Sequence, residues 1–375
     1  MASKPLLIID RNIPYLQGVL EPFARVEYAD FFTNESVKNA DGLLIRTRTH
    51  INESLLANSN VKFIASATIG FDHIDLNFCK KNGIAVFNAP GCNAGSVQQY
   101  IASVLMNLLK KDQKFGEITL GIVGIGHTGS KLKQFAEAIG MKVLLNDPPR
   151  QRKEGSDQFV GLEKLLAESD IISFHVPLTR EGEDATFHLL SEQNSVLIKP
   201  GTAILNASRG DVCDESSLKK LISTRNCEVV LDVWHNEPRI DHELLEIVAI
   251  ATPHIAGYSA DGKANASRMI AGSTAEFFGF NSDSFSFSKI PEPEIITIIP
   301  VNRTFEGIIS ECVLSTYNVL KDSERLKTDR RSFEHLRNSY PLRREFGVYK
   351  VNADNLPEKA VNSLSSIGFQ IIKMP

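Results

Sequence analysis

The sequence predicts an α/β protein built from parallel β-sheets covered by helices, and three observations support this fold class. Short apolar runs of strand length alternate with helix-like segments over most of the 375 residues, as is typical of βαβ units. A glycine-rich turn, Gly124-x-Gly-x-x-Gly129, lies between one apolar run and one helix-like segment. After residue 281 this rhythm gives way to a linker and a charged, helix-rich tail. We therefore expect a doubly wound parallel-sheet domain preceded by a smaller α/β domain and followed by a small α+β domain.

Composition and charge exclude several classes of protein. The chain is 42% hydrophobic and 23% charged, as expected for a folded globular protein, and its net charge of −4 gives no reason to expect nucleic acid or an anionic membrane as a partner. The five cysteines are odd in number and form no C-x-x-C pair, which favours reduced thiols in the cytoplasm. No apolar run approaches transmembrane length, and the first one is too short for a signal peptide. No cluster has metal-ligand spacing, so we predict no metal.

The first 92 residues predict a small parallel sheet. Five apolar runs read as strands and are separated by polar or helix-like stretches: 6–9, 24–28, 42–47, 62–67 and 84–88. A turn-rich segment follows at 88–93. Residues 94–111 then carry apolar side chains at helical spacing, which predicts one long helix joining two domains.

The middle of the chain predicts six further strands that alternate with helices: 118–123, 141–146, 170–176, 202–207, 228–233 and 248–252. Six strands is the number in a full doubly wound dinucleotide-binding domain. Residues 262–280 are again helix-like. Because the chain must return to the first domain after the sixth strand, we expect a flavodoxin-like substrate domain formed by residues 1–92 and 258–285, with the dinucleotide-binding domain at 93–257.

The tail is expected to form the third domain, residues 286–375. A linker at 281–293 is rich in Ser, Phe and Pro, and β-like runs follow at 295–301, 348–351 and 368–372. The charged stretch between them, 324–345, is interpreted as a solvated helix face in preference to a binding patch.

The glycine turn indicates a dinucleotide site, because it follows a strand, opens a helix and is followed by a second strand that ends in Asp147. Gly124 makes the tight turn, Gly126 lets the backbone approach a pyrophosphate, and Gly129 lets the helix pack on the strand. The helix N-terminus, with His127 and Thr128, offers N–H groups and a positive dipole end to the phosphates. A carboxylate at Asp147 can bond both ribose hydroxyls and would repel a 2′-phosphate. NAD is therefore favoured over NADP, although the nearby Arg150 leaves NADP open.

Polar side chains follow three neighbouring predicted strands. Arg209 follows the fourth strand, Asp232 and Glu237 follow the fifth, and His254 follows the sixth. Ligands of open parallel sheets bind at the carboxyl ends of the strands, so these groups should meet there. An imidazole can act as the base when a hydroxyl-bearing carbon gives up a hydride, a carboxylate can orient the imidazole, and an arginine can hold a substrate carboxylate. Asp232 is placed to bond the nicotinamide carboxamide. Taken singly each motif is more often an ordinary turn or loop; the joint placement favours catalysis.

These motifs resemble the D-isomer-specific 2-hydroxyacid dehydrogenases. The matching segments are Gly124-x-Gly-x-x-Gly129, Asn206-x-x-Arg209-Gly, Asp232-Val-Trp-x-x-Glu237-Pro and Thr252-Pro-His254-Ile-Ala-Gly257. Within that superfamily the chain is most similar to the 4-phosphoerythronate dehydrogenases. The segments that carry this second resemblance are Ala89-Pro-Gly-Cys-Asn93, Asn146-Asp-Pro-Pro149-Arg, and the tail motif Phe333-x-x-Leu336-Arg-x-x-Tyr340 with Arg343-Arg344-Glu345.

The resemblance implies NAD-dependent oxidation of 4-phospho-D-erythronate, a phosphorylated 2-hydroxy acid, to (R)-3-hydroxy-2-oxo-4-phosphobutanoate in pyridoxal 5′-phosphate (vitamin B6) synthesis. It also implies a homodimer built through the tail, with Arg209, Glu237 and His254 as catalytic residues. Further cofactor contacts are implied at Asp147, Val176, Ala207, Ser208, Arg209, Asp232 and Gly257. Substrate contacts are implied at Thr47, Thr68 and Tyr258.

The residues themselves leave the phosphate site and the exact activity open. Arg46, in the turn Arg46-Thr47-Arg48, is a candidate phosphate ligand, although such a turn can also be a solvated loop. Arg343 and Arg344 are weaker candidates that would act from a partner subunit. The rival interpretations are another D-2-hydroxyacid dehydrogenase, such as a 3-phosphoglycerate dehydrogenase with a regulatory tail, and a non-catalytic, NAD-sensing corepressor-like scaffold.

Overall fold

The computed structural model describes residues 4–110 and 113–373, and the chain divides into two compact units. The first comprises Met1–Asn93 and Ser259–Pro291, and the second comprises Ala94–Tyr258 and Glu292–Pro375. The tail thus groups with the central part of the chain in this division. A separate third domain with its own boundaries stays a prediction.

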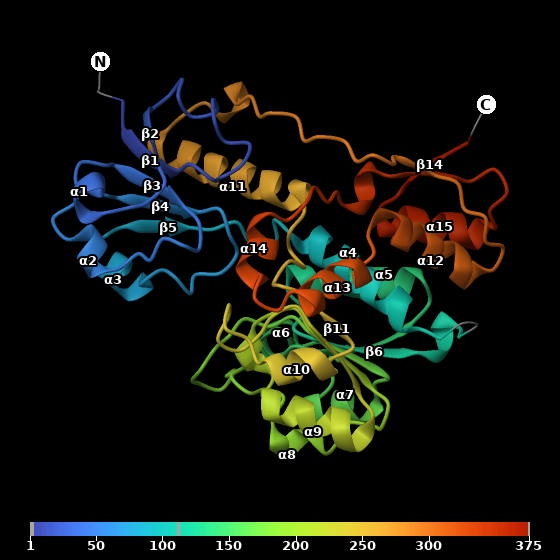
Figure 1. The fold of residues 1–375 in the computed structure, drawn as a ribbon. Helices are drawn as coiled ribbons and strands as arrows, with labels where there is room; N and C mark the ends of the chain where they lie inside the picture. The colour runs from blue at the N-terminus through green and yellow to red at the C-terminus, as the bar shows by residue number, and fades with distance from the viewer. Residues whose placement is uncertain (1–3, 111–112, 374–375) are drawn as a thin grey trace. The chain divides into compact units, whose positions relative to one another are not determined.

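The first unit contains one parallel sheet with helices on both faces (Figure 1). Its strands are β1 (Leu6–Asp10), β2 (Arg25–Ala29), β3 (Gly42–Ile45), β4 (Phe63–Ser66) and β5 (Ala85–Phe87), and its helices are α1 (Asn34–Val37), α2 (Glu53–Leu56), α3 (Leu76–Lys81) and α11 (Ala260–Phe278), followed by the 3-10 turn η3 (Ser282–Ser284). The strand order β2-β1-β3-β4-β5 is the flavodoxin-like order that the sequence predicts.

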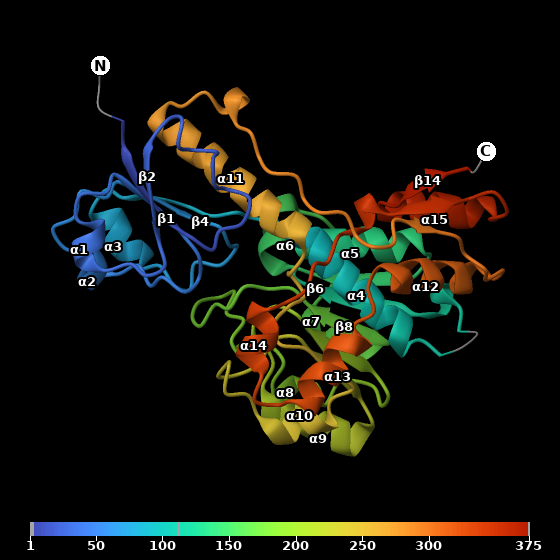
Figure 2. The ribbon, with the colours of Figure 1, turned by 45° about the horizontal axis from the view of Figure 1, so that its top comes forward.

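Alternate side chains of these strands face different helices, as the two-residue period of a strand requires. Ile8 of β1 packs in a cluster with α1, α2 and α3. Leu7 and Ile9 pack in another cluster with Ile270 and Ala271 of α11. Helix α11, which lies far from β1 in sequence, thus completes the second layer of the unit (Figures 1 and 2).

The second unit is built on a six-stranded parallel sheet with the order β11-β10-β9-β8-β6-β7. Its strands are β6 (Thr119–Val123), β7 (Lys142–Asn146), β8 (Ile171–Phe174), β9 (Ala203–Asn206), β10 (Glu228–Leu231) and β11 (Ile250–Ala251). Its helices are α4 (Ala94–Leu108), α5 (His127–Ala138), α6 (Pro148–Glu154), α7 (Leu162–Glu168), α8 (Glu192–Ser195), α9 (Glu215–Arg225) and α10 (His242–Ile247), with the 3-10 turns η1 (Phe115–Glu117) and η2 (Gly210–Val212). Because β6 pairs with both β7 and β8, the strand order reverses there, and ligands of such sheets bind at that point.

The six predicted strands are all present, and one additional pairing was missed. Phe159 forms an isolated parallel bridge to Leu145 at the outer side of β7. If this bridge is counted as a strand and the strands of this sheet are numbered in chain order from β6, the spatial order is 3-2-1-4-5-6-7. This order extends the usual dinucleotide-binding order by one strand. A single bridge residue has no alternating pattern that could reveal it in the sequence.

The two faces of the second sheet bury separate clusters. Leu120 and Ile122 of β6 pack with α4 and α5. Ile172 and Phe174 of β8 pack with α7, α9 and α10. The sheet is therefore covered on both sides, as predicted for a doubly wound fold.

The tail adds a three-stranded parallel sheet and four helices to the second unit. Its elements are β12 (Thr297–Ile298), β13 (Lys350–Asn352) and β14 (Gln370–Ile372), α12 (Phe305–Thr316), α13 (Leu320–Thr328), α14 (Phe333–Asn338) and α15 (Glu358–Ile367), and the 3-10 turn η4 (Phe346–Val348). Ile308 and Val313 of α12 and Leu364 of α15 belong to the cluster formed around α4 and α5. The tail thus shares a hydrophobic core with the sheet that precedes it. Figures 1 and 2 show α12 and α15 beside α4 and α5.

Two expectations need correction. The long helix predicted at 94–111 ends at Leu108, and residues 111–112 lie outside the described residues. The charged stretch 324–345 is not solvated throughout, because Arg343 and Arg344 are only 5% and 8% exposed. Within the described part of the chain, no helix is both long and apolar enough to cross a membrane.

Candidate active site

The glycine turn after β6 has the conformation that its sequence predicts. Gly124 has a φ of +89°, and a Cβ there would lie 2.7 Å from the carbonyl oxygen of His175. A Cβ on Gly129 would overlap the carbonyl oxygen of Gly124, so α5 and β6 can pack this closely only at glycine. A Cβ on Gly126 would meet no atom within 4 Å, so the space in front of the turn is open.

The N-terminus of α5 faces this open space. Gly126 is the N-cap and has no side chain to cap the helix, which leaves N–H groups of the first turn for a ligand. His127 is exposed and Thr128 is half-buried. Val176, which follows β8, packs against the turn, since its Cγ1 would lie 2.7 Å from a Cβ on Gly124.

Asp147 fixes the loop beside this turn. Its Oδ2 accepts a hydrogen bond of 2.7 Å from the backbone N–H of Ile125, and its Oδ1 caps α6 through the N–H of Arg150 at 3.0 Å. Arg150 in turn donates to the carbonyl of Ile125 at 2.5 Å and pairs with Glu154 at 2.6 Å. The acidic side chain therefore lies at the glycine turn, where the sequence places it.

The carboxyl ends of β9, β10 and β11 are joined by backbone hydrogen bonds beyond the strands themselves. The N–H of Asp232 donates to the carbonyl of Asn206 at 3.0 Å, and the N–H of His254 donates to the carbonyl of Asp232 at 2.8 Å. The residues that follow three separate strands are thus brought to one edge of the sheet, as expected from its parallel topology.

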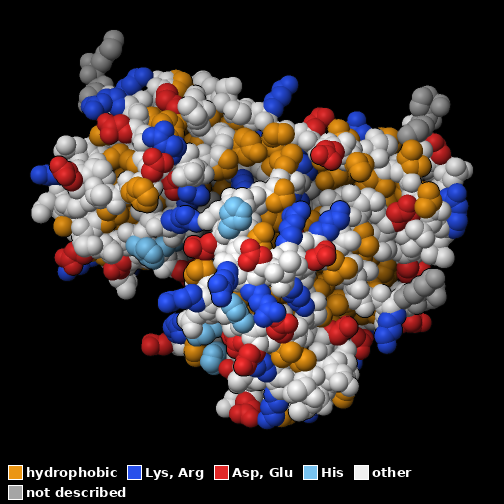
Figure 3. Space-filling view, in the orientation of Figure 1, with side chains coloured by type: hydrophobic (Ala, Val, Ile, Leu, Met, Phe, Trp, Pro, Cys, Tyr) orange, Lys and Arg blue, Asp and Glu red, His pale blue; other side chains and the backbone are white. Residues whose placement is uncertain are grey.

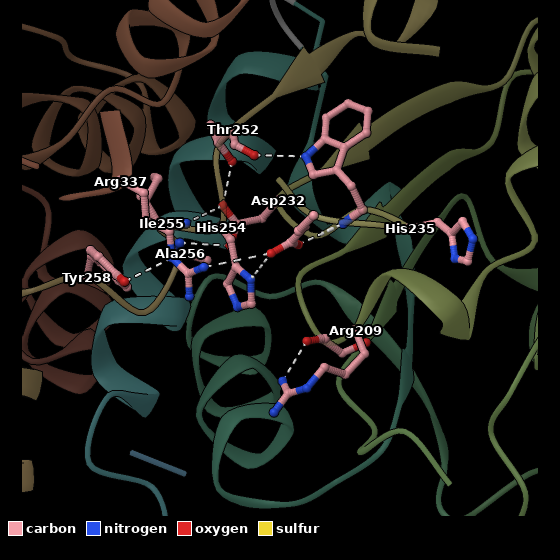
Figure 4. A network of polar contacts seen from close by, with 12 residues as sticks. Arg209, Asp232, His235, Thr252, His254, Ile255, Ala256, Tyr258 and Arg337 are labelled. Atoms are coloured by element: carbon pink, nitrogen blue, oxygen red, sulfur yellow. Dashed lines mark hydrogen bonds and ion pairs between the residues drawn. The ribbon is translucent and has the colours of Figure 1, made fainter. Parts of the chain in front are cut away.

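His254 and Glu237 form a hydrogen-bonded pair at this edge (Figure 4). Nδ1 of His254 lies 2.7 Å from Oε2 of Glu237, and Oε1 of Glu237 accepts the backbone N–H of Trp234 at 2.9 Å. The two side chains are 29% and 19% exposed. Burial opposes ionisation of Glu237, yet the charge and hydrogen bond of His254, the Trp234 N–H and the charge of Arg337 together hold the pKa of Glu237 below its usual value.

Asp232 organises the loop that carries His254. Its buried carboxylate accepts the N–H groups of Ile255 at 2.7 Å and Ala256 at 2.9 Å, together with the hydroxyl of Thr252 at 2.6 Å (Figure 4). His254 has a φ of +57°, a left-handed conformation that costs a non-glycine residue about 1–3 kcal/mol. The three bonds to Asp232 offset this strain and fix the direction of the imidazole.

Arg209 follows β9 in an extended backbone conformation with φ of −141°. Its Nη1 donates to the carbonyl of Ser208 at 2.8 Å, as Figure 4 shows. Asn206 ties the turn together, because its Oδ1 accepts from the N–H and hydroxyl of Ser208 and its Nδ2 donates to the carbonyl of Arg209. Ala207, within this turn, and Gly257, in the loop after β11, are half-buried.

A second cation, which the sequence did not predict, lies beside the His254–Glu237 pair. Arg337 of α14 donates from Nε to the hydroxyl of Tyr258 at 2.9 Å, and its Nη1 lies 3.9 Å from Oε2 of Glu237 (Figure 4). Tyr258, which the sequence predicted as a substrate contact, is thus linked through Arg337 to the His254–Glu237 pair. The tail motif contained Arg337, but the motif carried no signal that its side chain returns to the end of β11.

The other predicted substrate residues belong to the first unit. Arg46 makes a forked ion pair with the buried carboxylate of Asp10, at 2.9 Å from Nε and 3.2 Å from Nη2. Thr47 is exposed, and the hydroxyl of the half-buried Thr68 bonds Ser66 at 2.7 Å. Among the described residues, no three His, Cys, Asp or Glu side chains are grouped in a way that could hold a metal ion.

Comparisons with known proteins agree with this geometry. The family model for the NAD-binding domain of D-isomer specific 2-hydroxyacid dehydrogenases matches residues 106–256, and a model for a domain of unknown function matches residues 290–368. A solved D-lactate dehydrogenase from Aquifex aeolicus, bound to NAD and lactic acid, is 27% identical with a TM-score of 0.61, and the match covers 73% of this chain and 96% of that one. A solved NAD-bound 3-phosphoglycerate dehydrogenase from Entamoeba histolytica is 26% identical with a TM-score of 0.62, covering 77% and 100%. The fold and the site therefore define an NAD-dependent dehydrogenase of 2-hydroxy acids.

Two curated relatives narrow this class. The erythronate-4-phosphate dehydrogenase of Bacteroides fragilis is 47% identical over 92% of this chain and 98% of the relative. That of Hydrogenovibrio crunogenus is 35% identical over 99% of this chain and its own whole length. The chain belongs to the erythronate-4-phosphate dehydrogenase family.

Proposed function

We propose that this chain oxidises 4-phospho-D-erythronate at C2 to (R)-3-hydroxy-2-oxo-4-phosphobutanoate, with NAD as hydride acceptor, as a step in pyridoxal 5′-phosphate synthesis. The observation that carries the proposal is the His254–Glu237 pair, with its bond of 2.7 Å, at the carboxyl edge of a sheet whose first strand ends in a dinucleotide-binding turn. The substrate comes from the relatives' printed activity.

The residues of the second unit fit NAD. The open space in front of Gly126, the N-terminus of α5 and the carboxylate of Asp147 are suited to a pyrophosphate and an adenosine ribose. His127, Thr128, Val176, Ala207 and Ser208 would line the remainder of the cofactor, while Asp232 and Gly257 would lie near its nicotinamide. When bound, NAD supplies the carbon that accepts the hydride.

His254 is the proposed general base. Its Nδ1 is occupied by Glu237, so Nε2 is the nitrogen left to take the proton from the substrate's C2 hydroxyl as the hydride leaves C2. Glu237 would fix the tautomer and stabilise the imidazolium that forms, in the way a carboxylate does in other acid–base pairs. Arg209 would hold the substrate carboxylate and polarise the forming carbonyl. The proposed substrate contacts are Arg46, Thr47, Thr68 and Tyr258.

The proposal is tested by following NADH formation with 4-phosphoerythronate, erythronate and 3-phosphoglycerate. The phosphorylated four-carbon acid should give the highest kcat/KM. A preference for 3-phosphoglycerate would assign the chain to the other phosphorylated substrate, and no turnover with any 2-hydroxy acid would favour a non-catalytic scaffold.

The same assay tests the base. His254→Ala should lower kcat by roughly 10²–10⁴-fold, because the positioned proton acceptor is lost. Binding of NAD, followed by calorimetry, should persist in this variant. Wild-type turnover by His254→Ala would refute the mechanism.

A further inference from the structure

The guanidinium of Arg337 is held in place beside the catalytic pair by Tyr258. Its Nε bonds the Tyr258 hydroxyl at 2.9 Å, and its central carbon lies 5.7 Å from the centre of the Tyr258 ring. The side chain remains 29% exposed. Arg337 is thus fixed in direction without being enclosed.

The hydrogen-bond donors of Arg337 are only partly used. A guanidinium has five N–H donors, and the bond to Tyr258 uses the single one on Nε. Within the described part of the chain, Glu237 is the carboxylate that pairs with Arg337, but the separation of 3.9 Å from Nη1 is too long for a hydrogen bond. Glu237 is also fully engaged, with one oxygen on His254 and the other on the Trp234 N–H. The four donors on Nη1 and Nη2 can therefore bind an anion without breaking an existing bond of the site.

Other arginines considered for the phosphate are less suitable. Arg46 already forms its forked pair with Asp10. Arg343 and Arg344 are buried in their own chain, and Arg343 donates to the carbonyls of Ile255 and Ala256. Arg209 is assigned to the substrate carboxylate. Among these arginines, Arg337 combines exposure, a fixed direction and closeness to the His254–Glu237 pair.

Arg337 also lies outside the part of the chain that the NAD-binding family model matches, since that model ends at residue 256. The separate family model at 290–368 contains Arg337. A tail that brings a cation to the active site gives this scaffold a means to recognise a second anionic group.

We propose that Arg337 binds the phosphate of the substrate from the same chain that supplies His254 and Glu237. A phosphate ester carries up to two negative charges and three acceptor oxygens, which the forked donors of an arginine match. This assignment rests on the proposed function, since it names the residue that would distinguish 4-phosphoerythronate from erythronate.

The test compares wild type, Arg337→Gln and Arg337→Lys with phosphorylated and plain erythronate. Loss of a charge-assisted fork should raise KM for 4-phosphoerythronate by roughly 10- to 100-fold in Arg337→Gln. Plain erythronate lacks the phosphate, so its KM should change far less than that of 4-phosphoerythronate. A change in kcat or in the pH–rate profile that is common to both substrates reports the separate effect of the Arg337 charge on Glu237. Arg337→Lys should recover part of the loss, because lysine keeps the charge but not the fork. The matched control is Arg331→Gln, which removes an exposed tail charge and should leave both substrates unaffected.

Inorganic phosphate separates this proposal from the proposed function. It should inhibit wild-type oxidation of plain erythronate competitively and inhibit Arg337→Gln at least about tenfold less. If wild type fails to prefer the phosphorylated substrate, the proposed function fails, while phosphate inhibition still tests Arg337. Equal losses on both substrates would mean that Arg337 acts only through Glu237 and would overturn the assignment. Unchanged KM for the phosphorylated substrate would overturn it as well.

Discussion

Glu237 is the residue whose surroundings define the chemistry of the site. It receives hydrogen bonds from an imidazole and a backbone N–H and lies 3.9 Å from a guanidinium, so it stays ionised although it is largely buried. A carboxylate in this state favours the positive charge that His254 acquires when it takes a proton. The pair is therefore suited to proton abstraction rather than to metal binding or nucleophilic attack.

Glu237→Gln is expected to lower kcat by roughly 10- to 100-fold, because the variant keeps a hydrogen-bond acceptor but loses the charge. The acidic limb of the pH–rate profile should move to lower pH, since the imidazole then holds its proton less strongly. Steady-state rates across the acid range provide the measurement. An unchanged limb would show that Glu237 does not act on His254 electrostatically.

The same carboxylate has a consequence for stability. Its pKa in the folded chain lies below the usual 4.5, so its ionisation stabilises the fold above about pH 4.5. That contribution is lost as the pH falls through the lower, folded-state pKa. The difference in melting temperature between wild type and Glu237→Gln should therefore narrow in acid, and a constant difference across this range would contradict the assigned shift.

At the residue scale, the sequence predicted the polar side chains that follow strand ends. It did not predict that Arg337, on the tail helix α14, would lie beside them. His254 and Glu237 could be paired because parallel strands end at one edge, and the structure joins them by a 2.7 Å bond. The left-handed backbone of His254 and the approach of Arg337 could not be predicted. Both depend on contacts between segments far apart in the chain, which no local pattern encodes.

At the scale of elements, the loop between β11 and α11 is held from two sides. Asp232 accepts the N–H groups of Ile255 and Ala256, and Arg343 donates from Nη2 to the carbonyls of the same two residues, at 3.2 Å and 2.5 Å. The same Nη2 also bonds the Ser96 hydroxyl. The tail thus fixes the peptide groups that directly follow His254.

Burial of Arg343 is compensated only in part by hydrogen bonds. Its Nε and Nη1 have no partner among the described residues. The guanidinium lies over the rings of Tyr317, at 4.5 Å, and Tyr340, at 5.6 Å, and such cation–π contacts are worth about 2 kcal/mol when desolvated. The aromatic rings therefore supply stabilisation that polar partners do not.

Arg343→Met should destabilise the fold by about 2–4 kcal/mol, because methionine fills much of the volume but loses the charge-assisted bonds to Ser96, Ile255 and Ala256 and the contacts with the two tyrosine rings. The loop that carries His254 should loosen, so kcat should fall while NAD affinity stays nearly constant. Thermal unfolding and NAD titration measure the two effects. Arg331→Gln is the matched control. An unchanged melting temperature in Arg343→Met would show that the contacts of Arg343 do not stabilise the fold.

The sequence predicted the strands of the two larger sheets better than it predicted the charged part of the tail. All eleven strands expected in the first 252 residues are present, because apolar runs bounded by turns identify buried parallel strands. The high charge of segment 324–345 wrongly predicted a solvated helix face. Arg343 is buried there, because its guanidinium contacts the Tyr317 ring and donates to the carbonyl of Ala256. The charge of a segment alone cannot distinguish an exposed helix face from a buried arginine that binds backbone carbonyls.

At the scale of the whole molecule, the tail cannot be treated as a detachable appendage. Ile308, Val313 and Leu364 lie in the same cluster as residues of α4 and α5, so removing residues 290–375 would expose the core of the second unit. Such a truncation would test folding rather than assembly. A homodimer, which the resemblance implies, is better tested by changing exposed residues of the tail.

The most exposed apolar residues of the tail surround β12, an edge strand of the three-stranded sheet. Ile295, Ile299 and Val301 are 60%, 57% and 73% exposed. Figure 3 shows hydrophobic side chains at the surface over the tail elements. Apolar residues along an unpaired strand edge are typical of surfaces that pair with another chain. We therefore expect this edge to contribute to the homodimer that the resemblance implies.

If the chain forms the implied homodimer through this edge, replacing Ile299 and Val301 together by glutamate should yield a monomer, because two charges would have to be buried in the contact. Light scattering after size-exclusion chromatography measures the mass, and thermal unfolding checks that the fold is retained. Leu320→Glu is the matched control, since Leu320 is an apolar residue of α13 that is 44% exposed and does not belong to β12, and this variant should keep the oligomeric state of the wild type. A monomeric wild type would contradict the dimer, whereas a double variant that stays dimeric would place the contact elsewhere.

Because Arg337 reaches Glu237 within one chain, the monomeric variant should keep the wild-type preference for the phosphorylated substrate. Loss of that preference would mean that the partner subunit completes the site.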